Sequence, residues 1–383
     1  MSELADINGS GTERISAPST TEEKIFVASQ WQLMWWRFRK HKMAMVAGVV
    51  LIVLYTMAIF CEFFAPYDPL KFDSKLTFVP PMQIHFRDPQ GNWTAPFVFG
   101  IKQQIDPFSY QRTYVVDETK MYRVYLFAKG DPYKLWGIFS SDRHLIGTEG
   151  NTGPLFLVGT DSMGRDLLSR IIYGSRVSLS IGLVGVFLSL ILGIIIGGIS
   201  GYYGGAVDNL IQRVIEFIRS IPSIPLWMGL SAALPPDWPV VRVYFGITVI
   251  LSLIGWTGMA RVVRGRFLSL REEDFVMAAR LAGASEMRIV LRHMVPSFLS
   301  HIIASVTLAI PGMILGETAL SFIGVGLRAP AISWGVLLQS AQSLVTVAKA
   351  PWLLIPGLYV ILSVLSFNFL GDGIRDAADP YSR

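Results

Sequence analysis

The sequence lacks the residue patterns from which most catalytic, redox and metal sites are built. It contains one cysteine, Cys61, so no disulfide can form within the chain. The five histidines, at positions 41, 85, 144, 293 and 301, are scattered without the spacing of metal ligands. The dipeptide Gly-Lys does not occur, which excludes a P-loop that would hold ATP phosphates. We therefore expect a chain that is not an enzyme, needs no cofactor and has no ATPase site of its own.

Charged residues are also scarce. Asp, Glu, Lys and Arg make up 16% of the chain, whereas about a quarter is usual in soluble domains. Hydrophobic residues make up 52% and the mean hydropathy is +0.47, which is typical of a chain whose solvent is largely lipid. The formal net charge of +5 is small. We therefore predict an all-α polytopic membrane protein that contacts membrane lipid and no nucleic acid.

Long apolar runs predict six transmembrane helices, because a bilayer core needs about 20 mostly apolar residues in helix. Five runs fit this length: residues 43–64, 177–200, 243–260, 297–316 and 350–370. The remaining run, third in chain order at 221–234, is short and contains Pro222 and Pro225. It reaches full length only if residues 214–218 continue the same helix, with a kink that neighbouring helices cover.

Basic residues indicate the orientation of these helices. They cluster before the first span, at 37–42, and between the fourth and fifth spans, at 261–292. Six spans place both clusters on one side of the membrane, and five would place them on opposite sides. Because Lys and Arg near span ends favour the cytoplasm, we expect both termini and the Arg-rich loop there.

Aromatic and basic residues at 31–38 fit either an interfacial helix or an anchor for the end of the first span. With this segment included, the predictions divide the chain into five parts. The parts are a cytoplasmic N-terminal tail with this interfacial segment (1–42), transmembrane helix 1 (43–64), an external insertion (65–176), a core of transmembrane helices 2–6 with the cytoplasmic loop 261–296 (177–371), and a cytoplasmic C-terminal tail (372–383).

The external insertion reads as a small, mostly β subdomain. Turn signals such as Pro80-Pro81 separate short stretches of alternating residues, at 113–116 and 122–127, which predict strands. Two interpretations stay open: an insertion without a contact role, or a surface that helps to dock an external partner protein.

The Arg-rich loop reads as a helix, a break and a second helix. Ala278 and Ala279 are small and favour helix, and Gly283 can take the left-handed conformation that ends one. Ser285 can cap the next helix. Such a short alanine-lined helix suits insertion into a groove on a partner, and the alternative is an ordinary surface helix pair.

Two further sets of residues are candidates for packing or function. Gly193, Gly197 and Gly201 recur every fourth residue, which predicts close packing against a helix of this chain or of a second subunit. Glu317, near the outer end of the fifth span, either faces a path through the membrane interior or pairs with a nearby arginine, and pairing is favoured.

A third set lies just before the short run: Arg213, Glu216 and Arg219 are three residues apart and can pair along one helix face.

The Arg-rich loop resembles the EAA motif of binding-protein-dependent ABC transporter permeases. In that motif two alanines are followed by a glycine four residues after the second, as at Ala278, Ala279 and Gly283, while Met277 replaces the motif's glutamate. The stretches 159–176, 201–208 and 367–380 look like the C-type subunit of the oligopeptide/dipeptide branch. The resemblance implies an ABC importer permease whose residues Ala278, Ala279, Arg280, Gly283 and Ser285 couple it to an ATPase.

The same resemblance implies a biological setting. The chain would form half of a translocation pathway in the bacterial inner membrane for oligo- or dipeptides delivered by an external solute-binding protein. Its partners would be a second permease subunit, commonly a different one, and two ATP-binding subunits. Oligosaccharides, nickel or opine-like solutes remain the alternative substrates. A membrane enzyme would need paired intramembrane carboxylates, a metal set or a nucleophile with a base, and Glu317 alone does not supply one. A sensor or scaffold that binds a ligand without moving it would have no use for the EAA-like loop.

Overall fold

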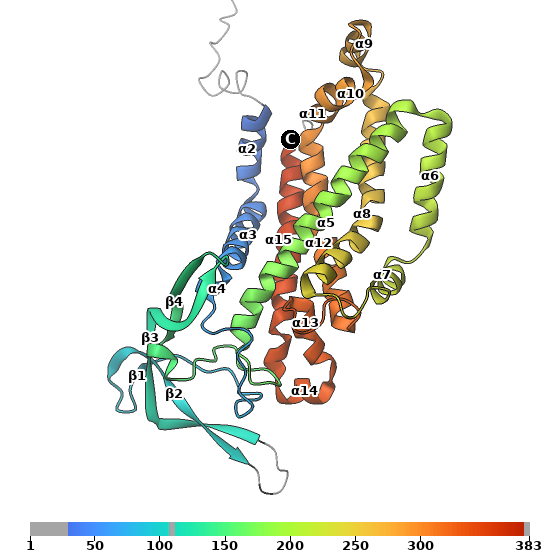
Figure 1. Cartoon of the computed structure of the whole chain (residues 1–383). Coiled ribbons are helices and arrows are strands. Elements are labelled where there is room, and N and C mark those ends of the chain that lie inside the picture. Colours follow the sequence, from blue (N-terminus) through green and yellow to red (C-terminus); the bar gives the residue numbers. More distant parts are fainter. Residues whose placement is uncertain (1–29, 106, 108–111, 379–383) are drawn as a thin grey trace, which may run out of the picture.

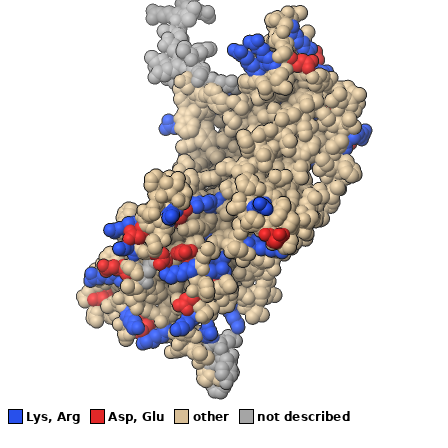
Figure 2. Space-filling model, viewed as in Figure 1, with Lys and Arg blue, Asp and Glu red and all other residues tan. Residues whose placement is uncertain are grey.

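The computed structural model describes residues 30–105, 107 and 112–378. Most of the expected N-terminal tail and the last five residues lie outside the described residues. Figure 1 shows a bundle of long helices with a β-sheet at one end and a group of short helices at the other. On the face shown in Figure 2, charged residues gather over the sheet and at the opposite tip, and the belt between them is almost uncharged.

Five helices of the described residues are long and apolar enough to cross a membrane. Their windows of mean hydropathy range from 1.7 to 2.8, and each overlaps a span expected from the sequence. They are α3 (Lys42–Ile59), α5 (Leu167–Tyr203), α8 (Val240–Leu270), α12 (Leu299–Ile323) and α15 (Ile355–Ala378), the last preceded by a 3-10 helix at Pro351–Leu354. The prediction of a mostly helical, polytopic membrane protein is therefore confirmed.

Helices α5 and α8 pack side by side and run in the same direction. Near the start of α8, the hydroxyl of Tyr244 donates to Ser180 Oγ of α5 at 3.0 Å. Further along, Ser252 Oγ donates to the carbonyl of Gly185 at 3.0 Å. Two parallel helices that follow each other in the chain require that the segment between them returns across the bundle, so residues 204–239 make that return.

The return is not the single kinked helix that the sequence predicted. It consists of α6 (Gly205–Ser220) and α7 (Ser223–Ala232), separated at Ile221 and Pro222. Ile221 has φ −86° and ψ 129°, which is extended backbone, because the ring of a following proline disfavours the helical conformation. The described residues therefore hold five long helices and one broken pair, and the expectation of a continuous third helix was wrong.

The remaining helices close the bundle. Helix α12 runs antiparallel to α5, and Gly182 of α5 faces Ile314 of α12. Helix α15 runs antiparallel to α3: Gly48 faces Leu370 and Gly373 faces Ala44. The two ends of the described chain therefore lie on the same side of the bundle. A short helix α2 (Gln30–Lys40) precedes α3 at that side, where the sequence indicated an interfacial segment, and α15 continues past residue 371 to Ala378.

The insertion forms a four-stranded antiparallel sheet in the order β1-β2-β3-β4. The stretches at 113–116 and 122–127 both fall in the long third strand. A small cluster of Val98, Val124 and Leu155 forms its core. The strands are β1 (His85–Arg87), β2 (Trp93–Ile105), β3 (Arg112–Leu135) and β4 (Phe139–Thr148). His144 joins the sheet to the bundle through Nδ1, which lies 2.6 Å from the carbonyl oxygen of Ala65.

The polar motif before α5 shapes the start of that helix. Asp161 accepts hydrogen bonds from the backbone N–H of Met163 at 2.8 Å and pairs with Arg165 at 2.8 Å and with Arg170. Asp166 caps α5 by accepting from the N–H of Ser169 at 2.7 Å. Burial raises the pKa of Asp166 to about 6. The motif thus fixes where the second long helix leaves the sheet end.

Candidate functional site

The end of the bundle opposite the sheet carries the loop that the sequence singled out. It joins α8 to α12 and projects beyond both (Figure 1). As the sequence predicted, it is a helix, a break and a second helical segment, although that second segment is irregular. The elements are α9 (Asp274–Leu281), α10 (Glu286–Arg288), a π-helical turn (Ile289–Met294) and α11 (Val295–Ser297).

Gly283 ends α9 in the left-handed conformation, with φ 76°. The N–H of Gly283 donates to the carbonyl of Arg280 at 2.9 Å, and the N–H of Ala284 donates to that of Ala279 at 3.0 Å. This pair of bonds is the Schellman motif, which satisfies the last carbonyls of a helix. A Cβ at Gly283 would meet nothing within 4 Å, so backbone conformation rather than space selects glycine here.

Ser285 stands at the predicted capping position but does not cap with its side chain. It has extended backbone, with φ −65° and ψ 151°, directly before α10. Within the described residues its hydroxyl forms no capping hydrogen bond, and its carbonyl instead accepts from the N–H of Ile289 at 3.0 Å. The predicted hydroxyl cap was therefore wrong, while the position of the helix start was right.

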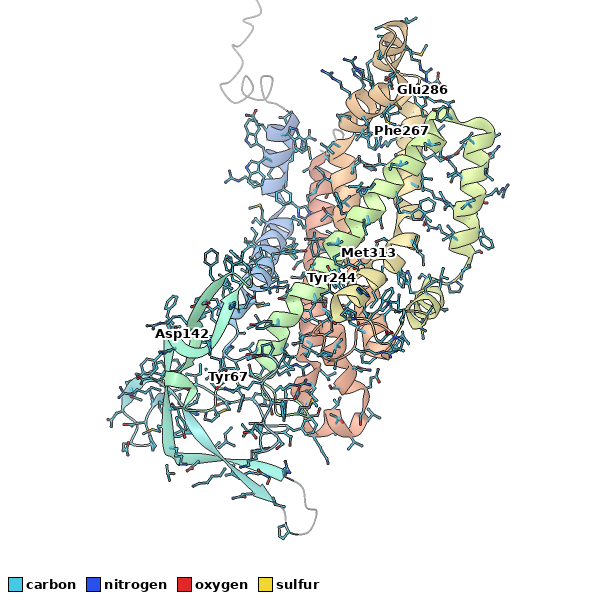
Figure 3. The ribbon with its side chains drawn as sticks, in the orientation of Figure 1. Tyr67, Asp142, Tyr244, Phe267, Glu286 and Met313 are labelled. Atoms are coloured by element: carbon cyan, nitrogen blue, oxygen red, sulfur yellow. The ribbon has the colours of Figure 1, made fainter. Side chains whose placement is uncertain are left out.

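The loop is anchored to the bundle on one face. Val276, Ile289 and Met294 are buried in a cluster with Phe267 of α8 and Phe298 at the start of α12. Figure 3 shows Phe267 at this end of the bundle, just below Glu286. Because both ends of the loop pack into one cluster, α9 has to move together with α8 and α12.

Two polar contacts attach the loop to the end of α5 as well. The guanidinium of Arg280 lies 5.2 Å from the centre of the Tyr202 ring, within cation–π range. The hydroxyl of Tyr203 donates to the Glu286 carboxylate at 2.5 Å. Arg280 therefore has a structural contact on its own chain in addition to any role toward a partner.

The opposite face of the loop is apolar and uncovered. Leu281 is 88% exposed and Met287 is 67% exposed, and Phe275 and Met277 beside them are also exposed. Of the residues predicted to couple, Ala278, Arg280, Gly283 and Ser285 are exposed, and Ala279 is half-buried. Met277, which replaces the motif's glutamate, belongs to this apolar face. Exposed apolar patches with a polar rim mark sites of contact with a protein, a membrane or a ligand.

A charged cluster that the sequence reasoning missed lies at the same end. The guanidinium of Arg264 on α8 donates from Nε and Nη2 to the Asp208 carboxylate on α6, both at 2.5 Å. Ser200 of α5 donates its hydroxyl to Asp208 at 2.5 Å. Asp208 thus joins α5, α6 and α8. The resembling stretch 201–208 contains Asp208 and the Arg-rich loop contains Arg264, but nothing in their spacing shows that the two residues meet.

Replacing Arg264 with glutamine should destabilise the bundle, because it leaves the largely buried Asp208 carboxylate without its cation. We expect the free energy of unfolding to fall by about 1–3 kcal/mol, seen as a lower melting temperature of the purified complex. Arg213→Gln is the matched control, because its pair with Glu216 on α6 is exposed and worth at most about 1 kcal/mol. Equal melting of the two variants would contradict a structural role for Arg264.

The three glycines of α5 face α8 of the same chain. A Cβ at Gly197 would lie 2.4 Å from the carbonyl oxygen of Ala260, and one at Gly193 would lie 2.5 Å from Cγ of Met259. A Cβ at Gly201 would lie 2.6 Å from Cβ of Phe267. The sequence left open whether the partner helix belonged to this chain, and the geometry of these contacts places it here.

Glu317 does not pair with an arginine. It is fully buried in α12 and accepts hydrogen bonds from the hydroxyls of Ser333 at 2.7 Å, Ser321 at 2.8 Å and Ser178 at 3.2 Å. Ser333 begins α13 (Trp334–Gln339), so the carboxylate joins α5, α12 and α13. The predicted ion pair was therefore wrong among the described residues, because three serine hydroxyls satisfy the carboxylate instead.

Comparison with known proteins agrees with these features. The family described as "Binding-protein-dependent transport system inner membrane component" matches residues 189–383, and "N-terminal TM domain of oligopeptide transport permease C" matches residues 29–81. The oligopeptide transport system permease protein OppC of Haemophilus influenzae is 41% identical over 59% of this chain and 70% of its own length. OppC of Bacillus subtilis is 28% identical over 100% of this chain and 97% of its own.

Two further comparisons cover different ranges. The dipeptide transport system permease protein DppC of Lactococcus lactis is 31% identical over 96% of this chain and 93% of its own length. Among solved structures, an inward-facing form of the MetNI methionine ABC transporter covers 56% of this chain and 98% of its own, with TM-score 0.43 and 21% identity. This chain is a multi-pass membrane protein that belongs to the family of binding-protein-dependent transport system inner membrane components, in its oligopeptide/dipeptide permease branch.

Proposed function

We propose that this chain is the permease subunit of an ATP-driven importer of oligo- or dipeptides and forms half of the translocation pathway. The observation that carries the proposal is the uncovered apolar face of α9, held on the tip of the long helices. The similarity to relatives named as oligopeptide and dipeptide permeases supports the substrate class. The chain itself is a transport subunit rather than an enzyme, and separate subunits hydrolyse ATP.

The proposed coupling runs through α9. An ATP-binding subunit would receive Leu281 and Met287 in a groove, with Ala278 and Ala279 allowing a close approach. Because α9 is anchored to α5, α8 and α12, closure of two ATP-binding subunits would move these helices as a body. Gly283 and Ser285 would set the angle between α9 and the chain that follows. A second permease, commonly a different chain, would complete the pathway.

In this assignment the chain crosses the membrane six times. The pair α6 and α7 serves as a broken third crossing, which the parallel packing of α5 and α8 supports. The basic residues near α2 and in the α9 loop favour the cytoplasm for that end and for both termini. The sheet then lies outside a bacterial inner membrane, where a solute-binding protein delivers its cargo.

The proposal is tested by measuring the uptake of a labelled tri- to pentapeptide in cells with and without this gene, with a labelled oligosaccharide in parallel. We expect deletion to abolish peptide uptake alone, and the wild-type gene to restore it. Loss of saccharide uptake alone would overturn the substrate class, and loss of neither would overturn the importer assignment for these solutes.

A further inference from the structure

The break between α6 and α7 opens onto a cavity in the middle of the bundle. The cavity has a volume of about 690 Å³ and is lined by residues of α5, α6, α7, α8 and α12. Its lining includes residues between Leu251 and Val262 of α8 and between Ser305 and Met313 of α12, in the central turns of both helices. Figure 3 shows Met313 at mid-height, between Phe267 near the α9 tip and Tyr67 at the sheet end.

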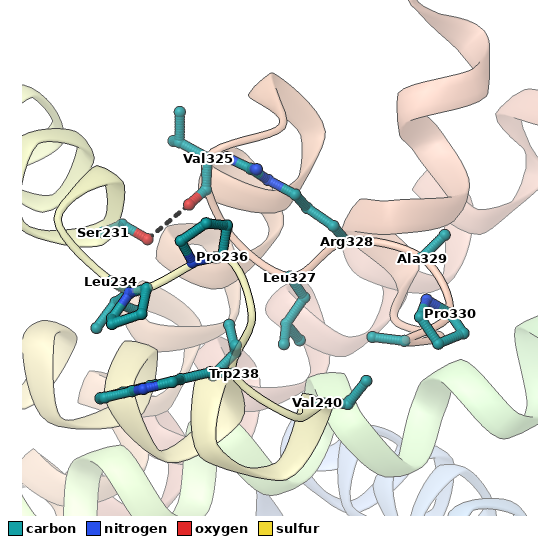
Figure 4. A pocket seen from close by; sticks show the side chains of 14 residues that line it. Ser231, Leu234, Pro236, Trp238, Val240, Val325, Leu327, Arg328, Ala329 and Pro330 are labelled. Atoms are coloured by element: carbon teal, nitrogen blue, oxygen red, sulfur yellow. Dashed lines mark hydrogen bonds between the residues drawn. The ribbon is translucent and has the colours of Figure 1, made fainter.

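The position of the break has a physical reason. Backbone groups that leave a helix within a membrane need partners, so such a break is stable only inside protein or beside a water-filled cavity. Ile221 and Pro222, the residues of the break, line this cavity together with Ser223, the first residue of α7. One turn after the cavity, Ser231 of α7 donates its hydroxyl to the carbonyl of Val325 at 2.7 Å, which ties α7 to the loop after α12 (Figure 4).

The lining of the cavity carries a single charge. It combines hydroxyls, such as those of Ser189 and Thr257, with apolar groups and with the glycines of α8 and α12. Among the described residues that line it, Arg219 is the only charged one. Nη1 of Arg219 lies 4.0 Å from where a Cβ would stand at Gly258 of α8. The glycine therefore leaves the guanidinium room against the helix.

Arg219 has no anion of its own. The sequence predicted that it could pair with Glu216, but Glu216 instead accepts from Arg213 at 2.9 Å. In the part of the chain that the structure describes, no ion pair includes Arg219, and its side chain is exposed. An unpaired charge at membrane depth is costly and marks a substrate or ion pathway by default.

We propose that Arg219 is a transient binding site for a carboxylate of the passing solute, with the C-terminal carboxylate of a peptide as its main ligand. The inference rests on the proposed function, because it requires peptide cargo. A guanidinium presents a planar set of donors that matches a carboxylate in a bidentate arrangement. A single cation without a second one beside it holds the anion weakly enough for release, which transport requires.

The test uses the whole importer reconstituted in liposomes, with its binding protein supplied already loaded with peptide, so that affinity for the binding protein does not enter. Three labelled cargoes are compared: a neutral tripeptide with a free C-terminal carboxylate, the same peptide as its C-terminal amide, and the amide with a central glutamate. Initial uptake rates are measured for wild type, Arg219→Gln, Arg219→Lys and Arg213→Gln. The last is the control, on the same helix but outside the cavity lining.

We expect Arg219→Gln to lower uptake of the free acid at least about tenfold, since a hydrogen bond to a charged group is lost, and to change uptake of the amide less than about twofold. Arg219→Lys should retain an intermediate rate, and Arg213→Gln should match wild type. A loss for the glutamate-containing amide as well would mean that Arg219 binds side-chain carboxylates too.

An equal loss for acid and amide in Arg219→Gln, or no loss for either, would overturn the assignment of the carboxylate site while leaving the importer intact. Absence of peptide uptake by the wild-type importer would instead overturn the proposed function, and the carboxylate site with it.

Discussion

Replacing Gly197 with leucine should leave almost no assembled permease in the membrane. The first side-chain atom would lie 2.4 Å from the carbonyl oxygen and 2.8 Å from the Cα of Ala260, and both belong to the backbone of α8. A backbone cannot turn aside as a flexible side chain can, so α5 and α8 would have to separate along their shared face. Overpacking usually costs about 1–3 kcal/mol, and we expect at least the upper end here.

The measurement is the amount of the chain in isolated membranes together with the melting temperature of the purified fraction. Gly265→Leu is the matched control, because it places the same side chain on α8 where a Cβ meets nothing within 4 Å. This control should accumulate as wild type does. Normal abundance and melting of the Gly197 variant would contradict the close packing of α5 on α8.

Replacing Leu281 with aspartate should leave the permease folded but disconnect it from its ATP-binding subunit. Leu281 is 88% exposed, so its own chain loses little when the side chain changes. In a groove on a partner, however, the new carboxylate would be desolvated without a cation, and the apolar contact would be lost. Central contacts of this kind contribute about 2 kcal/mol or more each, and a buried unpaired charge adds to the loss. We expect at least about a hundredfold weaker association and a matching loss of uptake.

Co-purification of the ATP-binding subunit with the permease measures this effect directly. Leu344→Asp provides the control, since Leu344 on α14 (Leu344–Lys349) is 87% exposed at the opposite end of the bundle. The control permease should retain its ATP-binding subunit. Full retention by the Leu281 variant would mean that α9 is not the docking helix.

Much of the helical architecture follows from hydrophobicity alone. A run of about 20 apolar residues has few alternatives to a membrane helix, so five long helices could be placed before the structure was known. The spacing of Gly193, Gly197 and Gly201 predicted a close helix–helix contact, because small residues along one face let two helix backbones approach each other. The spacing did not identify α8 as the partner, since packing against a helix of the same chain and packing against a second permease require the same pattern.

The break between α6 and α7 shows where local sequence patterns stop being sufficient. Pro222 and Pro225 signalled an interruption, and either a kinked helix or two helices would fit that signal. Which of the two forms depends on whether neighbouring helices bury the freed backbone groups or a cavity lies beside them. That is a property of the assembled bundle and not of the local sequence. The same limit explains the unpaired Arg219, whose expected partner Glu216 bonds Arg213 instead.

The candidate coupling site was located because its signals are local. The turn at Gly283 depends on one glycine and on carbonyls within five residues, so the sequence indicated its conformation. Glu317 and Asp208 were misjudged or missed because their partners are remote. Glu317 is bonded by Ser178, which lies 139 positions away, and Asp208 by Arg264, which lies 56 positions away.

The central claim, that α9 seats in an ATP-binding subunit, is tested most directly by cross-linking from single cysteines. Cys61 is the chain's sole cysteine, so Cys61→Ser provides a cysteine-free background into which Leu281→Cys or, as a control at the sheet end, Ile138→Cys is introduced. With a thiol-to-amine cross-linker in native membranes, the account predicts a covalent adduct with the ATP-binding subunit from position 281 and none from position 138. An adduct from position 138, or none from position 281, would contradict it.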